Sequence, residues 1–425
     1  MVRIEGHKTK TENKSSEKLP LPSEVYIPLS QHLGKSCQPE VELGQYVLRG
    51  QRIANISAAV YAPVHASLSG KIVSVCDWPH PVLGRAKAIV VAGDGKDLSV
   101  DTDTVSSEQI RNYTPKQIQN IVLEAGIVGM GGAGFPTHIK LNPPKPVDTL
   151  IVNGAECEPF LTGDYRLMVE NTDEILRGIE IVARCLGVDK VYIAIEDNKP
   201  QAIRLFDQKL KHLPGYQIRI LKTQYPQGGE KQLIKNILGR EVPRGKLPFD
   251  VGVVVHNVGT VFAIFEAVYL NKPLYERMVT VTGSCVFDPK NLWVRVGTPI
   301  KDLIEYCGLK ENPAKIIIGG PMMGIAQYTD EVPVIKTTTG VILMNEQESK
   351  ITEEDYCIRC GACIRSCPVG LMPCLINLAS QNEMWLQAKY YGAQDCIECG
   401  LCSYVCPADR NLVQSIKRAK LEVSK

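Results

Sequence analysis

Eight of the fifteen cysteines stand in two short runs near the C-terminal end of the chain. Each run has the spacing CxxCxxCxxxCP. Thiolates are soft ligands that suit iron, and two-residue spacers let one loop place three sulfurs around one cube of iron and sulfide. The spacing therefore predicts two [4Fe–4S] clusters. Their ligands are Cys357, Cys360, Cys363 and Cys367 in the first run, and Cys396, Cys399, Cys402 and Cys406 in the second.

The fourth cysteine of each run is expected to serve the other cluster, as in two-cluster ferredoxins. Cys406 then completes the first cluster, and Cys367 completes the second. A pair of zinc sites is the simpler alternative, but structural zinc sites typically use two CxxC pairs, not three closely spaced cysteines with a fourth before a proline. Cys374 lies outside the pattern and is interpreted as an ordinary buried thiol.

A second candidate site begins at the glycine-rich segment GMGGAGFPTHIK. Successive backbone amides in such a loop can form an anion-binding concavity, and Lys140 adds a positive charge. The segment matches neither GxGxxG between a strand and a helix nor GxxxxGK[ST], so on its own a tight turn explains it equally well. The glycines concerned are Gly129, Gly131, Gly132 and Gly134.

Three further segments carry polar residues that could join this loop. They offer Asn153, Glu156 and Glu158; Tyr225, Gly228, Gly229 and Glu230; and Asn257 and Thr260. For each segment taken alone, a surface loop with solvated side chains is the favoured interpretation. Several of these sets follow predicted strands, however, where a parallel sheet presents its ligand-binding edge. Together they indicate a ligand site.

The elements that position these residues form several domains, because 425 residues are too many for one hydrophobic core. Short β-branched segments over residues 24–75 predict a small β-domain. Strand and helix patterns alternate over residues 147–270, which predicts a largely parallel sheet. A smaller α+β segment follows over residues 273–344, and the cysteine module has a helical pattern between its two runs and a short basic helix after them.

The composition excludes several classes of protein. With 44% hydrophobic and 22% charged residues the chain is typical of soluble globular proteins, and a net charge of +2 does not favour nucleic acid as a partner. The first residues lack the apolar run of a secretion signal, so a reducing cytosolic compartment is expected. Polar residues interrupt the longest apolar stretch, near residues 251–270, so no transmembrane segment is predicted.

Several segments together resemble the C subunit of the Rnf electron-transport complex, an ion-translocating ferredoxin:NAD oxidoreductase. They are PLPSEVYIPLSQHLG, APVHASLSGKI, GIVGMGGAGFPTHIKL, IVNGAECEPFLTGDYRLM, GGPMMG and the two cysteine runs. The resemblance spans residues 19–407. The central part is also similar to the FMN- and NADH-binding flavoprotein subunit of respiratory complex I.

The resemblance implies a multidomain fold of α/β and α+β parts. After a polar leader (1–18), it implies an N-terminal barrel-sandwich hybrid domain of lipoyl-like type with a linker (19–110). A central Rossmann-like α/β domain that binds FMN and NAD(H) (111–272) follows. An SLBB-type β-grasp domain (273–345) and a C-terminal α-helical ferredoxin-like domain with two [4Fe–4S] clusters (346–425) complete the chain.

The same resemblance implies roles for the residues of the second site. Residues that would contact FMN are Gly129, Gly131, Lys140, Asn153, Glu156, Tyr225, Gly228, Asn257 and Thr260. Residues on the nicotinamide-dinucleotide side of the flavin would be Gly132, Ala133, Phe135, Glu158 and Glu230, with Phe135 a suitable stacking partner for a flat ring. No protein side chain is expected to act as a catalytic acid or base.

The sequence departs from the related patterns in four places. The lipoyl-like hairpin has VHASLSG without a lysine, so no covalent cofactor is expected there. Lys140 is followed by Leu141, Asn142 and Pro143 where the complex I flavoprotein tends to have a second aromatic residue, so the dinucleotide pocket is expected to differ in detail. The FxGGxHP opening common in the Rnf family is reduced to RIEGHKTKTENK, and the C-terminal extension of some members is absent.

The implied function is electron transfer between reduced ferredoxin and NAD⁺, coupled by membrane subunits to Na⁺ or H⁺ transport. A flavin suits this position because nicotinamide exchanges electrons in pairs and the clusters carry them singly. Expected partners are a ferredoxin-like B subunit and the membrane D and G subunits, with ferredoxin acting indirectly, at the cytoplasmic face of the bacterial inner membrane. Alternatives are a cobalamin reductase of the propanediol-utilisation type and a non-enzymatic electron relay with a vestigial nucleotide pocket.

Overall fold

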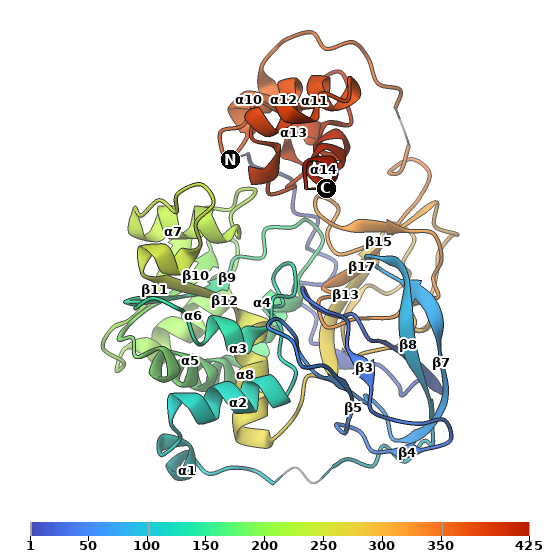
Figure 1. Cartoon of the computed structure of the whole chain (residues 1–425), viewed down its shortest axis with the longest axis vertical. Coiled ribbons are helices and arrows are strands. Elements are labelled where there is room, and N and C mark those ends of the chain that lie inside the picture. Colours follow the sequence, from blue (N-terminus) through green and yellow to red (C-terminus); the bar gives the residue numbers. More distant parts are fainter. Residues whose placement is uncertain (1, 101–102, 351, 425) are drawn as a thin grey trace.

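The structure is a computed structural model that describes residues 2–100, 103–350 and 352–424. Figure 1 shows two sheet domains beside an α/β domain, and a helical module that stands at one end of the molecule. The module follows a chain segment that leaves β17 (Gly340–Met344) and reaches α10 (Ala362–Ser366). Within the described ranges, no helix combines the length and the apolar character needed to cross a membrane.

The first domain consists of two small antiparallel sheets around one apolar core. Their strand orders are β2-β8-β7-β4 and β3-β5-β6. Val25 and Ile27 of β2 point inward and are fully buried, as the two-residue period of a half-buried strand requires, and Ile89 of β8 is buried in the same core. The strands are β2 (Glu24–Pro28), β3 (Gln38–Pro39), β4 (Tyr46–Val47), β5 (Arg52–Asn55), β6 (Val64–His65), β7 (Gly70–His80) and β8 (Gly84–Gly93).

The second domain is a parallel sheet with helices on both faces, as predicted. Its order is β11-β10-β9-β12, formed by β9 (Thr149–Gly154), β10 (Lys190–Glu196), β11 (Tyr216–Leu221) and β12 (Val253–Asn257). One face packs on α7 (Glu230–Leu238), and the other on α2 (Pro115–Glu124), α5 (Thr172–Leu186), α6 (Pro200–Leu210) and α8 (Val258–Leu270). The short elements are α1 (Ser107–Arg111), α3 (Thr137–Lys140), α4 (Gly163–Glu170) and η1 (Pro248–Val251). Because the strands are parallel, their carboxyl ends meet at one edge.

The third domain is a six-stranded sheet in the order β1-β14-β13-β17-β15-β16. Its members are β13 (Glu276–Gly283), β14 (Lys290–Arg295), β15 (Lys315–Ile318), β16 (Ile325–Gln327) and β17, with α9 (Ile300–Cys307) packed against it. The remaining strand, β1 (Glu17–Lys18), comes from the N-terminal segment and pairs in parallel with β14. The segment that the sequence suggests as a polar leader therefore contributes to this sheet.

Lys336 joins the three domains at their common boundary. Its ammonium group donates to the carbonyl oxygen of Pro63 in the first domain (2.6 Å) and to that of Gly126 in the second (2.7 Å). The side chain is 1% exposed, and burial lowers the pKa of Lys336 to about 7. The interface therefore contains a lysine that is buried among backbone carbonyls.

The helical module holds both cysteine runs. It comprises α10, α11 (Pro373–Gln381), α12 (Trp385–Tyr390), η2 (Ala393–Asp395), α13 (Leu401–Tyr404) and α14 (Leu412–Val423), and buried residues such as Ile376 and Ile416 form its core. The predicted helical pattern between the runs is divided into α11 and α12. Glu383 adopts a φ of 55° between them, a left-handed conformation that a right-handed helix does not accommodate.

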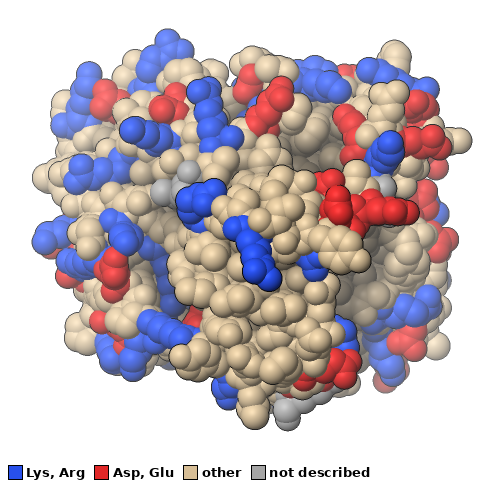
Figure 2. Space-filling view, turned by 90° about the horizontal axis from the view of Figure 1, so that it is seen from above, with Lys and Arg blue, Asp and Glu red and all other residues tan. Residues whose placement is uncertain are grey.

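Charged residues of both signs are spread over the face that carries this module. Figure 2 looks onto that face and shows Lys and Arg side chains across it, together with a group of Asp and Glu at one side. No single sign covers the whole face, in agreement with a net charge of +2. Large apolar side chains are also exposed in the module, among them Tyr356, Ile358, Leu386 and Tyr390.

Candidate functional site

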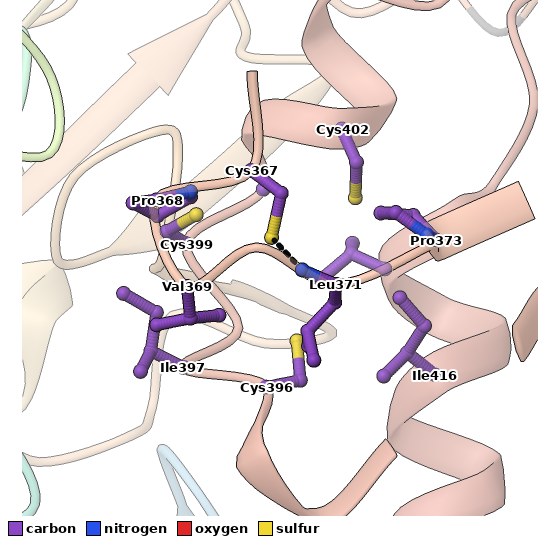
Figure 3. Close-up of a pocket in the computed structure, with 12 residues that line it drawn as sticks. Cys367, Pro368, Val369, Leu371, Pro373, Cys396, Ile397, Cys399, Cys402 and Ile416 are labelled. Atoms are coloured by element: carbon purple, nitrogen blue, oxygen red, sulfur yellow. Dashed lines mark hydrogen bonds between the residues drawn. The ribbon is translucent and has the colours of Figure 1, made fainter. Parts of the chain in front are cut away.

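Four of the predicted cluster ligands line one cavity in the helical module. They are Cys396, Cys399 and Cys402 of the second run and Cys367 of the first. Figure 3 shows the four side chains around this cavity, with Val369, Leu371 and Ile416 among the apolar residues that complete the wall. The structure therefore brings Cys367 to the second run, which is the crossing that the sequence predicts. Four thiols in one apolar cavity fit an iron–sulfur cluster.

The surroundings of these thiols favour the protonated thiol over the free thiolate. The backbone amide of Leu371 donates to Sγ of Cys367 (3.3 Å), and that of Glu398 donates to Sγ of Cys396 (3.4 Å). Burial raises the pKa of Cys399 to about 11 and that of Cys402 to about 12. Since iron binds the deprotonated form, each thiol must release a proton when it becomes a ligand.

The other four predicted ligands are more open to solvent. Cys357 and Cys360 are exposed in the segment before α10, whereas Cys363 is buried and Cys406 is half-buried in the module's core. Burial raises the pKa of Cys363 to about 11, with a further contribution from its neighbours Cys374 and Cys406. Among the described residues, no group of His, Cys, Asp and Glu side chains is arranged to hold a single metal ion, so the four thiols of the cavity could surround only a larger group such as a cluster. The structure thus brings Cys363 and Cys406 together but leaves Cys357 and Cys360 at the surface.

The glycine-rich loop is a closed turn whose tip is exposed. Its ends pair through Val128 and Pro136, and the amide of Gly129 donates to the carbonyl oxygen of Phe135 (2.9 Å). A Cβ atom on Gly131 would lie 3.1 Å from that of Asn257, whereas one on Gly132 would meet no atom within 4 Å. The tip is therefore packed against β12 on one side and open on the other, where a ligand could lie over the backbone.

Asparagines at the ends of two neighbouring strands hold the next two segments. Asn153 of β9 and Asn257 of β12 are partners in the sheet register. Asn153 donates to the carbonyl oxygen of Gly228 (2.9 Å), and Asn257 donates to the carboxylate of Asp164 (2.6 Å). Thr260, in the first turn of α8, accepts from the amide of Met130 (2.9 Å). Four predicted segments thus meet at the carboxyl edge of the sheet, and we call their residues the strand-end site: Gly129, Gly131, Lys140, Asn153, Glu156, Tyr225, Gly228, Asn257 and Thr260.

Lys140 contributes the positive charge of this site. Its ammonium group lies 2.7 Å from the carboxylate of Glu230 and 2.6 Å from the carbonyl oxygen of Val255. Lys140 follows the glycine loop and Glu230 begins α7, so the ion pair connects two segments with predicted roles on opposite sides of the flavin. A lysine and an open glycine loop at one edge are suitable for the phosphate of FMN.

Glu156 lies in the loop between β9 and α4, which we call the acidic loop (residues 154–162). Its carboxylate accepts from the backbone amides of Asp164 (2.8 Å) and Tyr165 (3.4 Å), in the first turn of α4. Burial raises the pKa of Glu156 to about 7, while the nearby Lys8 acts in the opposite direction. The helix start and Lys8 thus both compensate for the burial of this carboxylate.

Glu158, Tyr225 and Cys399 connect the strand-end site to the cluster cavity. Glu158 accepts from the backbone amides of Met322 (3.1 Å) and Met323 (3.0 Å) in the GGPMMG segment. The hydroxyl of Tyr225 lies 2.8 Å from the carbonyl oxygen of Cys399 and 3.2 Å from Glu158. Both carboxylate oxygens of Glu158 are therefore occupied by protein groups, although the resemblance places this residue on the dinucleotide side.

The partners of Glu158 do not follow from the sequence. The GGPMMG segment is part of the family resemblance, and its backbone amides hold a carboxylate of another domain, with Gly320 directly against that carboxylate. The three glycines of this segment, Gly319, Gly320 and Gly324, are the one available signal. They indicate a close backbone approach without naming the partner.

Comparison with protein families finds four domain models in order along the chain. They are the RnfC barrel sandwich hybrid domain (residues 2–96), the Nuo51 FMN-binding domain (122–266), the SLBB domain (278–326) and the 4Fe-4S dicluster domain (349–407). The four models confirm the predicted fold class. They also support FMN and iron–sulfur clusters as the cofactors of this chain.

Comparison with individual proteins gives near full-length relatives. The chain is 46% identical to the C subunit of the proton-translocating ferredoxin:NAD(+) oxidoreductase complex of Clostridium ljungdahlii, over 99% of this chain and 93% of the relative. It is 42% identical to the C subunit of the Na(+)-translocating complex of Acetobacterium woodii, over 95% and 91%. It is also 42% identical to the C subunit of the ion-translocating oxidoreductase complex of Rhodobacter capsulatus, over 100% and 82%.

Among solved structures, a chain of an NAD⁺-reducing [NiFe]-hydrogenase in the H₂-reduced state matches with a TM-score of 0.51 and 17% identity. The match covers 77% of this chain and 68% of that chain, and it shows a shared fold. The domain order and the near full-length relatives do not support the alternative of a cobalamin reductase. The chain belongs to the family of C subunits of ion-translocating ferredoxin:NAD(+) oxidoreductase complexes, the Rnf complexes.

Proposed function

We propose that this chain is the peripheral NAD(H)- and FMN-binding iron–sulfur subunit of a membrane Rnf complex. In that complex it passes electrons between reduced ferredoxin and NAD⁺, and the flow is coupled to Na⁺ or H⁺ transport. The observation that carries the proposal is the contact of Tyr225 with the carbonyl oxygen of Cys399, because it joins the strand-end site directly to the cysteine cavity. A two-to-one electron junction needs these two sites to be adjacent.

The strand-end site has the groups that FMN requires. Its open glycine loop and Lys140 would hold the phosphate, while the hydrogen bonds of Asn153 to Gly228 and of Asn257 to Asp164 fix the strand ends beside it. When bound, FMN exchanges electrons either in pairs or singly. The protein's own contribution is to bind and orient the flavin, and no side chain is assigned as a catalytic acid or base.

The dinucleotide is proposed to lie on the outer side of the glycine loop. Gly132 and Ala133 form the exposed tip, and Phe135 is half-buried just behind them. Phe135 would stack on a flat ring, and Glu230 would approach from the start of α7. Glu158 would shape this side through the GGPMMG segment that it holds.

Two clusters are proposed, one inner and one outer. The cavity set, Cys367, Cys396, Cys399 and Cys402, lies next to Tyr225 and would hold the inner cluster. The set with exposed Cys357 and Cys360, completed by Cys363 and Cys406, would hold the outer cluster. The outer cluster would face a ferredoxin-like B subunit, while the membrane D and G subunits would keep the chain at the cytoplasmic face of the bacterial inner membrane.

The test is an anaerobic NADH titration of the full chain loaded with FMN and iron, followed in the visible spectrum. We expect NADH to bleach the flavin promptly. Phe135→Ala should raise the NADH concentration for half-reduction roughly 2- to 13-fold, since an aromatic pair contributes about 0.5–1.5 kcal/mol. Glu174→Gln, in the first turn of α5, is the matched control and should behave as the unchanged protein does.

Two outcomes of this titration would contradict the proposal. If the flavin stayed oxidised in NADH while dithionite still reduced the clusters, the chain would be an electron relay without a working nucleotide site. If NADH bleached the flavin of the Phe135→Ala variant at the same concentration as in the unchanged protein, the proposed dinucleotide side would be wrong.

A further inference from the structure

The segment 2–18, which we call the N-terminal strap, runs along the acidic loop and the third domain. Val2 forms an antiparallel bridge with Tyr225, with amide-to-carbonyl distances of 3.0 Å and 2.7 Å. Figure 1 shows this end of the chain beside the helical module. Further along, Gly6 accepts from the amide of Phe160 (2.7 Å), and Thr11 shares a hydrogen bond with Thr162 (2.7 Å). A segment predicted as a polar leader thus contacts the acidic loop at several points.

Lys8 makes the densest contact between the strap and the acidic loop. Its ammonium group donates to three backbone carbonyl oxygens, those of Glu156 (2.9 Å), Glu158 (2.9 Å) and Leu161. An ammonium group has three donors, so all of them are used. The side chain is 9% exposed. One buried cation therefore determines the course of the backbone on both sides of Glu158.

The charge of Lys8 belongs to the same buried network as the acidic loop. Burial lowers the pKa of Lys8, and the carboxylate of Glu156 acts against that shift. A buried ammonium group needs hydrogen-bond acceptors and a nearby opposite charge, because a buried charge without compensation is strongly destabilising. Lys8 and Glu156 therefore stabilise each other.

Backbone strain also marks this contact. His7 and Phe160 both adopt left-handed conformations, with φ values of 48° and 69°, and their rings stack 4.7 Å apart. Residues other than glycine keep this conformation only where the surrounding structure holds them. The strap and the acidic loop thus hold each other in place.

We propose that Lys8 is a positioning residue that sets the acidic loop at the strand-end site, and so controls where the backbone that carries Glu156 and Glu158 lies beside flavin and dinucleotide. This inference rests on the proposed function for the identity of the ligands. Its structural part, that Lys8 holds the loop, stands independently. Lys8 touches no reacting atom and acts only through the loop.

The experiment compares Lys8→Met, Lys8→Arg and Lys14→Met in the full chain. Lys14 is the matched control because it lies in the same strap but bonds to Asp288 and to the carbonyl oxygen of Pro289 (3.0 Å), in the third domain. Hydrogen exchange of the amides over residues 154–165 reports the loop without any ligand. Flavin fluorescence gives the FMN dissociation constant, and iron content reports the cluster module.

We expect Lys8→Met to accelerate exchange over residues 154–165 at least tenfold and to weaken FMN binding at least tenfold, with iron content unchanged. Lys8→Arg should recover part of both effects, and Lys14→Met should show neither. Unchanged loop exchange in Lys8→Met would overturn the proposal. Equal acceleration in the β-strands of all three domains would also overturn it, because Lys8 would then stabilise the whole fold. If the unchanged protein bound no FMN, the proposed function would fail while the loop exchange still decided the role of Lys8.

Discussion

Replacing Tyr225 by phenylalanine should loosen the contact between the flavin domain and the cluster loop. The change removes one hydroxyl group and leaves the ring in place, so the packing of this 1% exposed side chain is retained. The hydroxyl has one proton to donate, and its nearer acceptor, the carbonyl oxygen of Cys399 at 2.8 Å, loses its donor in a buried place. An unsatisfied buried partner costs about 1–3 kcal/mol, which corresponds to roughly a 5- to 150-fold change in the opening equilibrium.

Hydrogen exchange of the amides over residues 396–405 measures this opening directly, since local opening sets the exchange rate. We expect exchange there to accelerate within that range in Tyr225→Phe, and exchange in β9 and β10 to stay as it is. Tyr390→Phe is the control, because Tyr390 lies in the helical module with residues 396–405 and is 82% exposed, so its hydroxyl is in contact with solvent. Identical exchange in the variant and the unchanged protein would refute the reasoning that this hydroxyl holds the two sites together.

Two further changes test the cysteine cavity and the domain boundary. Cys396→Ser should lower the iron content from about eight to about four atoms per chain, and flavin absorbance should be unchanged. Loss of FMN together with iron would contradict the proposal that flavin and clusters occupy separate sites. In the folded protein the pKa of Lys336 is about 7, below the usual lysine pKa near 10.4. At any pH between about 7 and 10.4, the unfolded chain therefore binds a proton at Lys336 that the folded chain does not. The unfolding free energy of the unchanged protein, measured relative to Lys336→Met, should therefore rise by up to about 1.4 kcal/mol per pH unit from about pH 7 upward. A difference independent of pH would show that Lys336 keeps its proton in the folded state.

Local patterns were sufficient for the parts of this protein that depend on neighbours in sequence. Short apolar runs predicted the four parallel strands, and their ends placed Asn153 and Asn257 on one edge, where the register makes them partners. The regular cysteine spacing and its crossing rule predicted that Cys367 joins the second run. For the strand ends and for the cysteine runs alike, the chemistry of a few residues and their order along the chain decide which side chains lie together.

Contacts between distant segments could not be predicted in this way. Glu158 and Met322 are 164 residues apart, and Lys8 and Glu156 are 148 apart. No spacing links such pairs, because the domains bring them together only after each has folded. The same reason applies to the N-terminal strap, whose polar composition gives no sign of a buried lysine. The division of the predicted helical pattern into α11 and α12 was missed because Glu383 is not a residue that usually ends a helix.

The strap also affects the order of events during synthesis. It leaves the ribosome before all of its partners, and Asp288, which binds Lys14 of the strap, follows 274 residues later. At translation rates of about 5–20 residues per second, the strap waits roughly 15–60 seconds for the third domain. During that time Lys8 can already hold the acidic loop, because its three acceptors, the carbonyl oxygens of Glu156, Glu158 and Leu161, are made long before the third domain. We therefore expect the strap to dock on the acidic loop first and on the third domain afterwards.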